Sequence, residues 1–422
     1  LVVGGFIDHL RYQGAGSSHI NPTKLEQFKD VMGEYSSFIT WAKGYSLDDD
    51  HDDQALIEEA IQKTSGIDKI IYLFGLPEKE EAEGFDRRHL NIPENQISLL
   101  KKLHTINPNI IGVAMGGSVM NLSFEHDYLK GLLLAYLGGQ GAARAVFDLL
   151  YGQENPSGRL AETWIDDIQS CNVQLTNNNH AVYYDESIYI GYRYYQSYNQ
   201  KPHYPFGYGL SYTTFSYDDI KVDDQGDHID VTVTITNTGE MKGKEVIQVY
   251  LQNSESSVYK ARLELKAFDK VELDVQETKT ITLQIPKSAC AHWDLYKKRW
   301  VIEKGDYEIV VAKNACEEID SIDIHIDGEE CHHTSMSYQK YTYDTSDFPK
   351  LIPTPLPPQS LKKMRPYSLS STLEDAKHTA MGRLVAKMII KTAMKETKNM
   401  SHDMVEIAKR TKIGRASCRE RV

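Results

Sequence analysis

Four glutamate side chains crowd one short stretch of the chain: Glu78, Glu80, Glu81 and Glu83. The stretch follows an apolar run at residues 70–74, which is typical of a buried strand, and precedes residues 96–103, which have the pattern of a helix. The glutamates are therefore expected in a loop at the carboxyl end of a strand, where α/β sheets bind ligands. Clustered carboxylates can exchange protons with a ligand, but composition alone favours the plainer interpretation, a solvated acidic loop.

The surrounding sequence predicts the sheet that would carry this loop. Apolar runs alternate with amphipathic segments over residues 1–165. Strands are expected at residues 1–7, 39–45, 69–76, 109–116 and 132–137, and helices near 21–35, 53–65, 94–107 and 140–152. We expect the first helix to begin at Asn21-Pro22 and the second at Asp52 and Asp53. This alternation predicts an α/β fold, a three-layer sandwich with a mainly parallel sheet.

Four predicted loops would meet at one edge of this sheet, because the carboxyl ends of parallel strands share an edge. They are residues 11–19, the glutamate loop, residues 116–120 and residues 138–141. The convergence predicts a ligand site, and the alternative is that the glycines merely begin helices tightly. The candidate cleft residues are Arg11, Tyr12, Ser17, Ser18, His19, Asp86 and Arg87.

Three other motifs are rejected. Residues 139–141 suggest a dinucleotide-binding loop, but Arg144 occupies a position that needs a small residue. The acidic run at 48–53 lacks the glycine and the spaced glutamate of a calcium loop. Residues 330–333 contain Cys and His, but adjacent ligands make a poor metal site. We expect no metal and no cofactor.

The second half of the chain changes character. Residues 166–210 form a connector rich in tyrosine, whose rings could stack on sugars but more simply pack between domains. Over residues 211–328 the period is two, as in the alternating run 229–236. About seven short strands predict an antiparallel β-sandwich.

The C-terminal region has three parts. A proline-rich linker at 348–358 leads to a capping box at residues 371–374 and a basic helix with an apolar face, within a tail that we delimit as 329–411. The helix could contact a membrane or a partner, but packing on the body of the protein is the simpler expectation. Residues 412–422 match the translation of a common sequencing adapter, and we interpret them as an artefact.

Composition narrows the classes of partner. The 422 residues carry a net charge of -13, which argues against nucleic acid and anionic membrane as main partners, and no apolar run approaches the length of a membrane span. The five cysteines have no paired spacing, so we expect a cytoplasmic rather than a secreted location. The chain opens within a predicted strand, so we expect an interior piece of a longer protein.

The motif Glu83-Gly-Phe-Asp-Arg87, with Leu90-Asn-Ile-Pro-Glu-Asn-Gln96 downstream and Phe74-Gly-Leu76 upstream, resembles glycoside hydrolase family 3 in its β-glucosidase branch. Residues 11–22, 138–141 and 151–164 resemble the family's second domain, although Ile165 stands where relatives usually have proline. Residues 190–195 and 204–215 resemble the connector, and 211–328 the fibronectin type III-like domain that follows it.

The resemblance implies a retaining mechanism with two carboxyl groups about 5–5.5 Å apart. It implies that Glu83 is the general acid/base, with Glu81 as runner-up, and that the nucleophile is an aspartate in a preceding (β/α)8 barrel. No matching aspartate motif occurs in these residues, so we predict little activity for the chain alone. The expected substrate is a small glycoside or oligosaccharide with a terminal β-D-glucosyl residue. A β-xylosidase or arabinofuranosidase, a non-catalytic carbohydrate-binding module and a nucleotide-binding enzyme are the alternatives.

Overall fold

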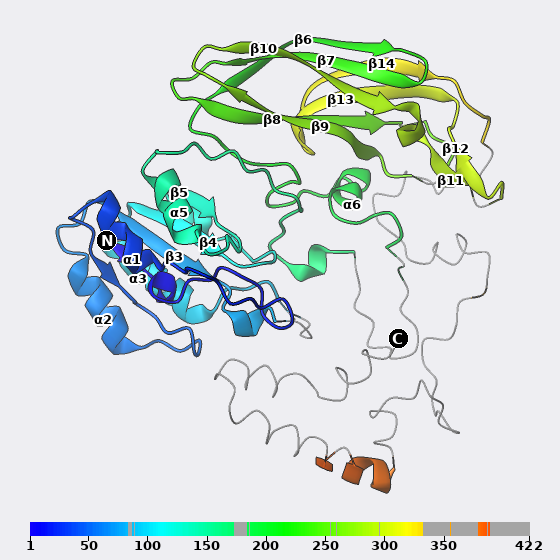
Figure 1. Ribbon diagram of the computed structural model, residues 1–422. Coiled ribbons are helices and arrows are strands. Elements are labelled where there is room, and N and C mark those ends of the chain that lie inside the picture. Colours follow the sequence, from blue (N-terminus) through cyan, green and yellow to red (C-terminus); the bar gives the residue numbers. More distant parts are fainter. Residues whose placement is uncertain are drawn as a thin grey trace. The chain divides into compact units, whose positions relative to one another are not determined.

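The computed structural model describes residues 1–82, 87, 89–172, 184, 186–253, 255–258, 260–294, 296–331, 355, 379–385 and 387–388. The chain divides into two compact units (Figure 1). The first comprises Leu1–Tyr151, Asp166–Ile168 and Gln359–Val422, and the second comprises Gly152–Ile165 and Gln169–Pro358. Each unit has its own sheets and its own buried apolar side chains.

A five-stranded parallel sheet in the order β2-β1-β3-β4-β5 forms the centre of the first unit. Its strands are β1 (Val2–Val3), β2 (Trp41–Ala42), β3 (Ile70–Gly75), β4 (Ile110–Met115) and β5 (Gly131–Leu134). All five predicted strands are confirmed, and the first two are shorter than expected. In each of β3 and β4, every residue but one is buried, so both faces of the sheet are covered at these strands.

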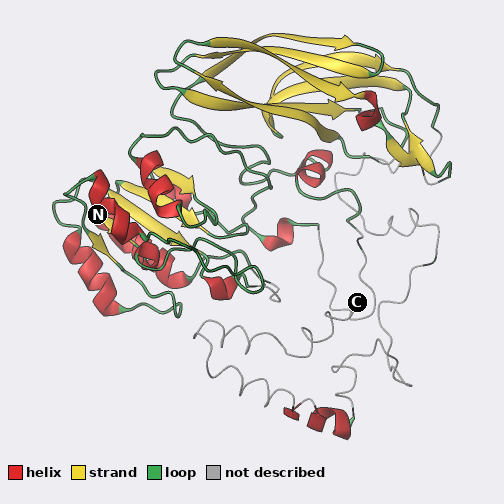
Figure 2. Ribbon diagram, in the orientation of Figure 1, coloured by secondary structure: helices red, strands yellow, loops and turns green. Residues whose placement is uncertain are grey.

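Helices surround this sheet, together with short 3-10 turns (Figure 2). They are α1 (Phe28–Tyr35), α2 (Gln54–Lys63), α3 (Glu94–Ile106), α4 (Glu125–Tyr128) and α5 (Ala142–Leu150), with turns η1 (Gly5–Ile7) and η2 (Glu78–Glu80). The four predicted helices are present, whereas α4 was not predicted. The rings of Phe28 on α1 and Phe147 on α5 pack edge to face, with centroids 6.0 Å apart.

The start of α1 differs from the prediction. The helix begins at Phe28, not at Asn21-Pro22, because the backbone N–H of Gln27 donates to Asp30 Oδ2 at 3.0 Å and so caps the helix there. The side chain of Gln27 is itself used to accept from the backbone N–H of Leu10 at 2.7 Å. The second helix begins as predicted, since Asp53 Oδ1 accepts from two backbone N–H groups of its first turn.

An antiparallel β-sandwich makes up most of the second unit. Its strands are β6 (Phe215–Asp224), β7 (His228–Asn237), β8 (Gly243–Gln252), β9 (Leu263–Leu273), β10 (Thr278–Pro286), β11 (His292–Asp294), β12 (Arg299–Val301), β13 (Gly305–Asn314) and β14 (Glu317–Ile326), with the turn η4 (Lys287–Cys290). The sheets β10-β7-β6 and β14-β13-β8-β9 share one apolar core. The predicted sandwich is confirmed, with β6 and β11 in addition to the seven predicted strands. Val231, Val233 and Ile235 of β7 point into the core and the threonines between them point out, which is the alternation expected of a strand covered on one face.

Several tyrosines of the connector are buried and pack within the second unit. Besides the turn η3 (Ile168–Ser170), this region forms α6 (Tyr192–Ser197). Tyr192 stacks on Phe206 with ring centroids 4.8 Å apart, and its hydroxyl accepts from the backbone N–H of Leu265 on β9 at 2.9 Å. These contacts lie within one unit, whereas the sequence favoured packing between domains.

The C-terminal tail is described only in part. Residues 380–385 are helical, and the side chains of Met381 and Leu384 are exposed. The predicted capping box at 371–374 and the residues 412–422 lie outside the described residues. In the described part of the chain, no helix has the length and apolar character needed to cross a membrane.

Candidate active site

A depression of about 390 Å³ opens at the carboxyl edge of the first unit's sheet. It is lined by residues of three of the four predicted loops and by Leu137, which directly precedes the fourth: Arg11, Gly14, Ala15, Ser18, Glu81, Ala82, Arg87, Gly117, Ser118 and Leu137. The chain order reverses between β1 and β3, so these two strands form the topological switch point of the sheet. Ligands bind α/β sheets at such a point, which is where the loops after β1 and β3 meet.

Arg11 joins the loop after β1 to the loop after β3. Its buried guanidinium donates from Nε to the carbonyl of Leu76 at 3.1 Å and from Nη1 to the carbonyl of Gln13. Nη2 lies 3.4 Å from Glu81 Oε2, and Nη1 lies 3.9 Å from Glu78 Oε1. Burial lowers the pKa of Arg11, and the charges of the two glutamates oppose this shift. The guanidinium therefore lies among acceptors that fix its position.

Glu81 joins the same loop to the end of β4. Its carboxylate accepts from the backbone N–H of Gly117 at 2.7 and 2.8 Å and from the hydroxyl of Ser118 at 3.2 Å, and its side chain is 8% exposed. The approach is so close that a Cβ on Gly117 would lie 3.1 Å from Glu81 Oε1 and 2.9 Å from Leu137. In all of these contacts the oxygens of Glu81 act as acceptors, so the side chain is already engaged by the loop after β4.

Arg87 anchors the far side of the loop. Its Nη1 donates to Ser118 Oγ at 3.0 Å and to the carbonyl of Val119 at 2.5 Å. Its Nη2 is buried and has no hydrogen-bond partner among the described residues. Burial lowers the pKa of the Arg87 guanidinium, and the negative charges of Glu81 and Glu80 act against it. The Arg87 guanidinium lines the depression and has one N–H group without a partner among the described residues, which suits the binding of an oxygen-rich ligand.

The base of the loop is anchored as well. Lys79, in η2, is buried and donates to the carbonyl of Asp48. Asn95, at the start of α3, donates to the carbonyls of Ser46 at 3.0 Å and Asp49 at 3.1 Å. The acidic run at 48–53 thus supports the loop, and its last residue, Asp53, caps α2 as the sequence predicted.

The structure brings together some of the predicted site residues and not others. Arg11, Ser18, Arg87 and the runner-up Glu81 line the depression. Tyr12, Ser17 and His19 are not among its lining residues; the hydroxyl of Tyr12 accepts from the side chain of Gln13. Glu83 and Asp86 lie outside the described residues, so their predicted roles stay predictions.

Some lining residues were not predicted individually, and two of them bind the side chain of Glu81. Gly117 and Ser118 come directly after β4, in the glycine-rich segment 116–120. The available signal was the pair of glycines at the end of a buried strand, which permits a side chain to reach the backbone. It did not indicate that the side chain would be Glu81.

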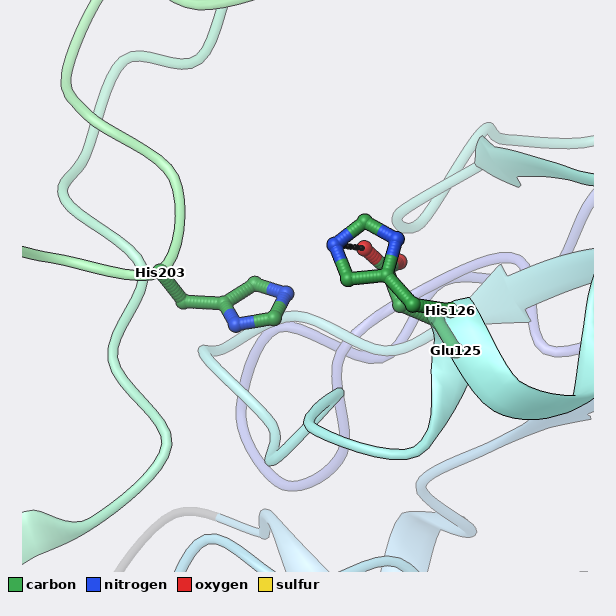
Figure 3. A group of neighbouring side chains, drawn as sticks. All are labelled: Glu125, His126 and His203. Carbon is green, nitrogen blue, oxygen red and sulfur yellow. Dashed lines mark ion pairs between the residues drawn. The ribbon is translucent and has the colours of Figure 1, made fainter.

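The described residues of the first unit also bring an acidic and a basic side chain together on α4. His126 Nε2 lies 3.5 Å from Glu125 Oε1 (Figure 3). His203, drawn in the same view, belongs to the second unit. The pair within the first unit offers one carboxylate and one imidazole, fewer ligands than a zinc site uses. His332 and His333 of the rejected metal motif lie outside the described residues.

Comparison with known proteins identifies the family. Residues 1–212, half of the chain, match the family described as Glycosyl hydrolase family 3 C-terminal domain. The chain belongs to glycoside hydrolase family 3. Residues 245–315 match the fibronectin type III-like domain, within the β-sandwich of the second unit.

Curated family 3 relatives differ in named activity. Thermostable beta-glucosidase B of Acetivibrio thermocellus is 40% identical over 331 residues, which cover 74% of this chain and 43% of the relative. An exo-alpha-(1->6)-L-arabinopyranosidase of Bifidobacterium longum is 37% identical, covering 78% of this chain and 44% of that protein. The chain thus spans less than half the length of these relatives.

Solved structures agree with the fold. The GH3 beta-glucosidase of Bifidobacterium adolescentis superposes with a TM-score of 0.74 and 31% identity, covering 91% of this chain and 52% of that one. The beta-glucosidase of Kluyveromyces marxianus in complex with glucose gives a TM-score of 0.62 at 31% identity, covering 66% of this chain and 34% of that one.

Proposed function

We propose that the enzyme to which this chain belongs hydrolyses terminal non-reducing β-D-glucosyl residues with retention of configuration. Glu83 is the general acid/base, and the nucleophile is an aspartate of an N-terminal barrel that precedes these residues. The observation that carries the proposal is the position of the two described residues that flank segment 83–86 in the sequence. Its neighbours on both sides, Ala82 and Arg87, line the depression at the switch point of the sheet. Ligands bind α/β sheets at this edge, which supports a catalytic role for the glutamate that lies between these two residues in the sequence.

Glu83 acts as an acid in the first step of the reaction and as a base in the second. In the first, the carboxyl group protonates the departing glycosidic oxygen while the nucleophile forms a glycosyl-enzyme. In the second, the resulting carboxylate takes a proton from the water that attacks the sugar. Glu81 suits neither step, since its carboxylate already accepts from Gly117 and Ser118 and lies beside Arg11. These contacts support Glu83 over the runner-up.

The test uses the full-length enzyme, defined as this chain preceded by its barrel. Glu83→Gln is expected to lower kcat/KM by about 100- to 10,000-fold for aryl β-glucosides with poor leaving groups, the usual range for general acid–base catalysis, and far less for 2,4-dinitrophenyl β-glucoside. Azide should restore part of the rate of Glu83→Ala by attacking the glycosyl-enzyme. If Glu81→Gln shows the leaving-group dependence and Glu81→Ala the azide rescue, the assignment moves to Glu81. If the chain alone hydrolyses an aryl β-glucoside at the full-length rate, the nucleophile does not belong to a separate barrel, and this part of the proposal is wrong.

The choice of sugar needs its own test. The Bifidobacterium relatives named exo-alpha-(1->6)-L-arabinopyranosidase are 37% and 36% identical to this chain, so an α-L-arabinopyranoside is the second candidate substrate. An α-L-arabinopyranose ring has the same hydroxyl arrangement as a β-D-galactose ring without its C6 group. The p-nitrophenyl β-D-glucoside, β-D-xyloside and α-L-arabinopyranoside should be compared by kcat/KM. The proposal expects the β-D-glucoside to be first by at least tenfold.

A further inference from the structure

We infer that the hairpin formed by β11 and β12 binds a neutral β-glucan chain through the rings of Trp293 and Trp300. The two strands form a small sheet of their own at one end of the second unit (Figure 1). None of the described residues that line the depression beside Arg11 belongs to this hairpin. The choice of a β-glucan as the ligand rests on the proposed function, whereas the presence of a binding surface does not.

Two tryptophans stand side by side on the solvent face of the hairpin. Trp293 and Trp300 are paired across the two strands, and their rings meet edge to face with centroids 5.9 Å apart. They are 48% and 65% exposed, and Tyr296, in the turn between the strands, is 80% exposed. Tryptophan is on average well buried in folded proteins, and grouped exposed aromatic rings mark a surface at which a ligand binds.

The hairpin holds these rings in a fixed position. Asp294 is 1% exposed, and its carboxylate accepts from the backbone N–H groups of Tyr296 and Lys297, both at 2.8 Å. Val301 belongs to a buried apolar cluster. Because side chains alternate between the faces of a strand, these two buried residues fix one face of the hairpin, and the tryptophans occupy the other. A ligand therefore meets a surface that needs little ordering when it binds.

The charges near the tryptophans favour a neutral ligand. Arg299 precedes Trp300 in the sequence and donates from both Nη atoms to the carboxylate of Glu329, at 2.7 and 2.8 Å. Lys297 Nζ donates to the same carboxylate at 2.7 Å. These two cations are thus neutralised within the protein, and the whole chain carries a net charge of -13. A phospholipid headgroup or an acidic polysaccharide would find little complementary charge here.

The size of the patch favours a small ligand over a protein. Among the described residues 276–294 and 296–331, the exposed large apolar side chains are those of Trp293, Tyr296 and Trp300. Three aromatic residues can bury at most about 450–750 Å², less than the roughly 800 Å² that each partner buries in a stable protein interface.

A pyranose ring fits both requirements. It is uncharged and small, and it has C–H groups on its faces and hydroxyls at its edges. One face can therefore pack on an indole ring while the hydroxyls stay in water. Because the chain belongs to a family of glycosidases, we take the ligand to be a neutral β-glucan.

Affinity electrophoresis of the full-length enzyme in native gels containing hydroxyethylcellulose tests the surface. This neutral β-glucan has few chain ends, so retardation reports binding along the chain. We expect Trp300→Ala to weaken the apparent affinity about tenfold, and Trp293→Ala combined with Trp300→Ala to abolish the retardation. Phe268→Ala is the matched control, since Phe268 is an aromatic residue of β9 in the same unit and is 66% exposed; its retardation should equal that of the wild type.

Leucine and phenylalanine variants separate stacking on a sugar from simple apolar burial. Leucine is apolar but has no flat ring, so the double leucine variant at positions 293 and 300 should lose the retardation. The double phenylalanine variant should keep its affinity within about threefold. Both should keep the wild-type Tm, because the replaced rings are exposed. A leucine variant with wild-type retardation would overturn the inference, since a lipid surface accepts leucine as readily as an aromatic ring.

The remaining outcomes distinguish this inference from the proposed function. Equal retardation of the wild type and the double alanine variant, or none in either, overturns the glucan surface. So does binding to vesicles of phosphatidylcholine and phosphatidylglycerol, or dimer formation in light scattering, if the double alanine variant loses it and the glucan has no effect. The kcat/KM for p-nitrophenyl β-D-glucoside should stay within about twofold in the double alanine variant. Tryptophan-dependent retardation in an enzyme without activity on β-D-glucosides overturns the proposed function and leaves the glucan surface in place.

Discussion

Gln96 links helix α3 to the strand from which the acidic loop emerges. Its side chain is fully buried; Oε1 accepts from the N–H of Gly75 at 2.8 Å, and Nε2 donates to the carbonyl of Gly75 at 3.0 Å. The main-chain carbonyl of Gln96 accepts from the hydroxyl of Tyr72 at 2.6 Å. One glutamine side chain thus forms hydrogen bonds with both the N–H and the C=O of Gly75, the last residue of β3. We predict that Gln96→Leu is strongly destabilising.

The size of the effect follows from what the substitution leaves behind. Leucine fills a similar volume, but it leaves a buried N–H and a buried C=O of Gly75 without their partners. Each unsatisfied group costs about 1–3 kcal/mol, so the first unit should lose about 3 kcal/mol of unfolding free energy. Because each 1.4 kcal/mol is a factor of ten, the opening equilibrium should increase roughly 100-fold.

Hydrogen exchange measured by mass spectrometry tests this prediction. The peptide covering β4, Ile110–Met115, makes no hydrogen bond to Gln96, so its exchange reports the opening of the whole unit. Its exchange should accelerate roughly 100-fold in Gln96→Leu and remain at the wild-type rate in Gln62→Leu, a control on an exposed position of α2. A change below threefold, or an equal acceleration in the β7 peptide of the second unit, would refute the reasoning.

Three further predictions concern both units. Gly75→Ala should prevent the first unit from folding, as seen by limited proteolysis, because φ is 141° and the new Cβ would lie 1.8 Å from the carbonyl oxygen of Met115. Glu245→Gln should cost the second unit about 3 kcal/mol in urea denaturation, because it removes the buried carboxylate 2.5 Å from Arg159, whose side chain is only 10% exposed. Burial raises the pKa of Glu303, but hydrogen bonds from two serines outweigh it and hold the pKa below its usual value. The loss of Tm in Glu303→Gln should therefore be largest near neutral pH and shrink as pH falls below about 4.

Each of these predictions has an outcome that would contradict it. A protease-resistant Gly75→Ala chain would mean that the end of β3 can shift. If replacing Arg159 and Glu245 together by apolar residues costs as much as Glu245→Gln alone, the loss is not that of an unpaired buried charge. A Tm difference for Glu303→Gln that grows toward low pH would contradict this prediction. A carboxyl group whose pKa is lower in the folded state stabilises the protein only while the group is ionised.

Local patterns in the sequence determined most of the elements. The apolar runs that became β3 and β4, and the alternation of Val231, Val233 and Ile235, follow from which faces of a strand are covered, and this pattern is visible over a few residues. The start of α1 was wrong because two capping signals compete within a short stretch. Asp30 caps the helix, and the side chain of Gln27 is held by the loop after β1, a contact that no local pattern contains.

The candidate site was also predicted only in part from local patterns in the sequence. A parallel sheet puts its carboxyl ends on one edge, so the strand pattern was enough to predict that four loops converge. Only the tertiary structure decided that Glu81 binds Gly117, 36 residues away, and that Arg11 reaches Leu76, 65 residues away. Such pairs depend on packing distances and on the depth of each side chain in the loop cluster, which spacing along the chain does not encode. The sequence determined which loops meet, and the tertiary structure decided which glutamate holds them together.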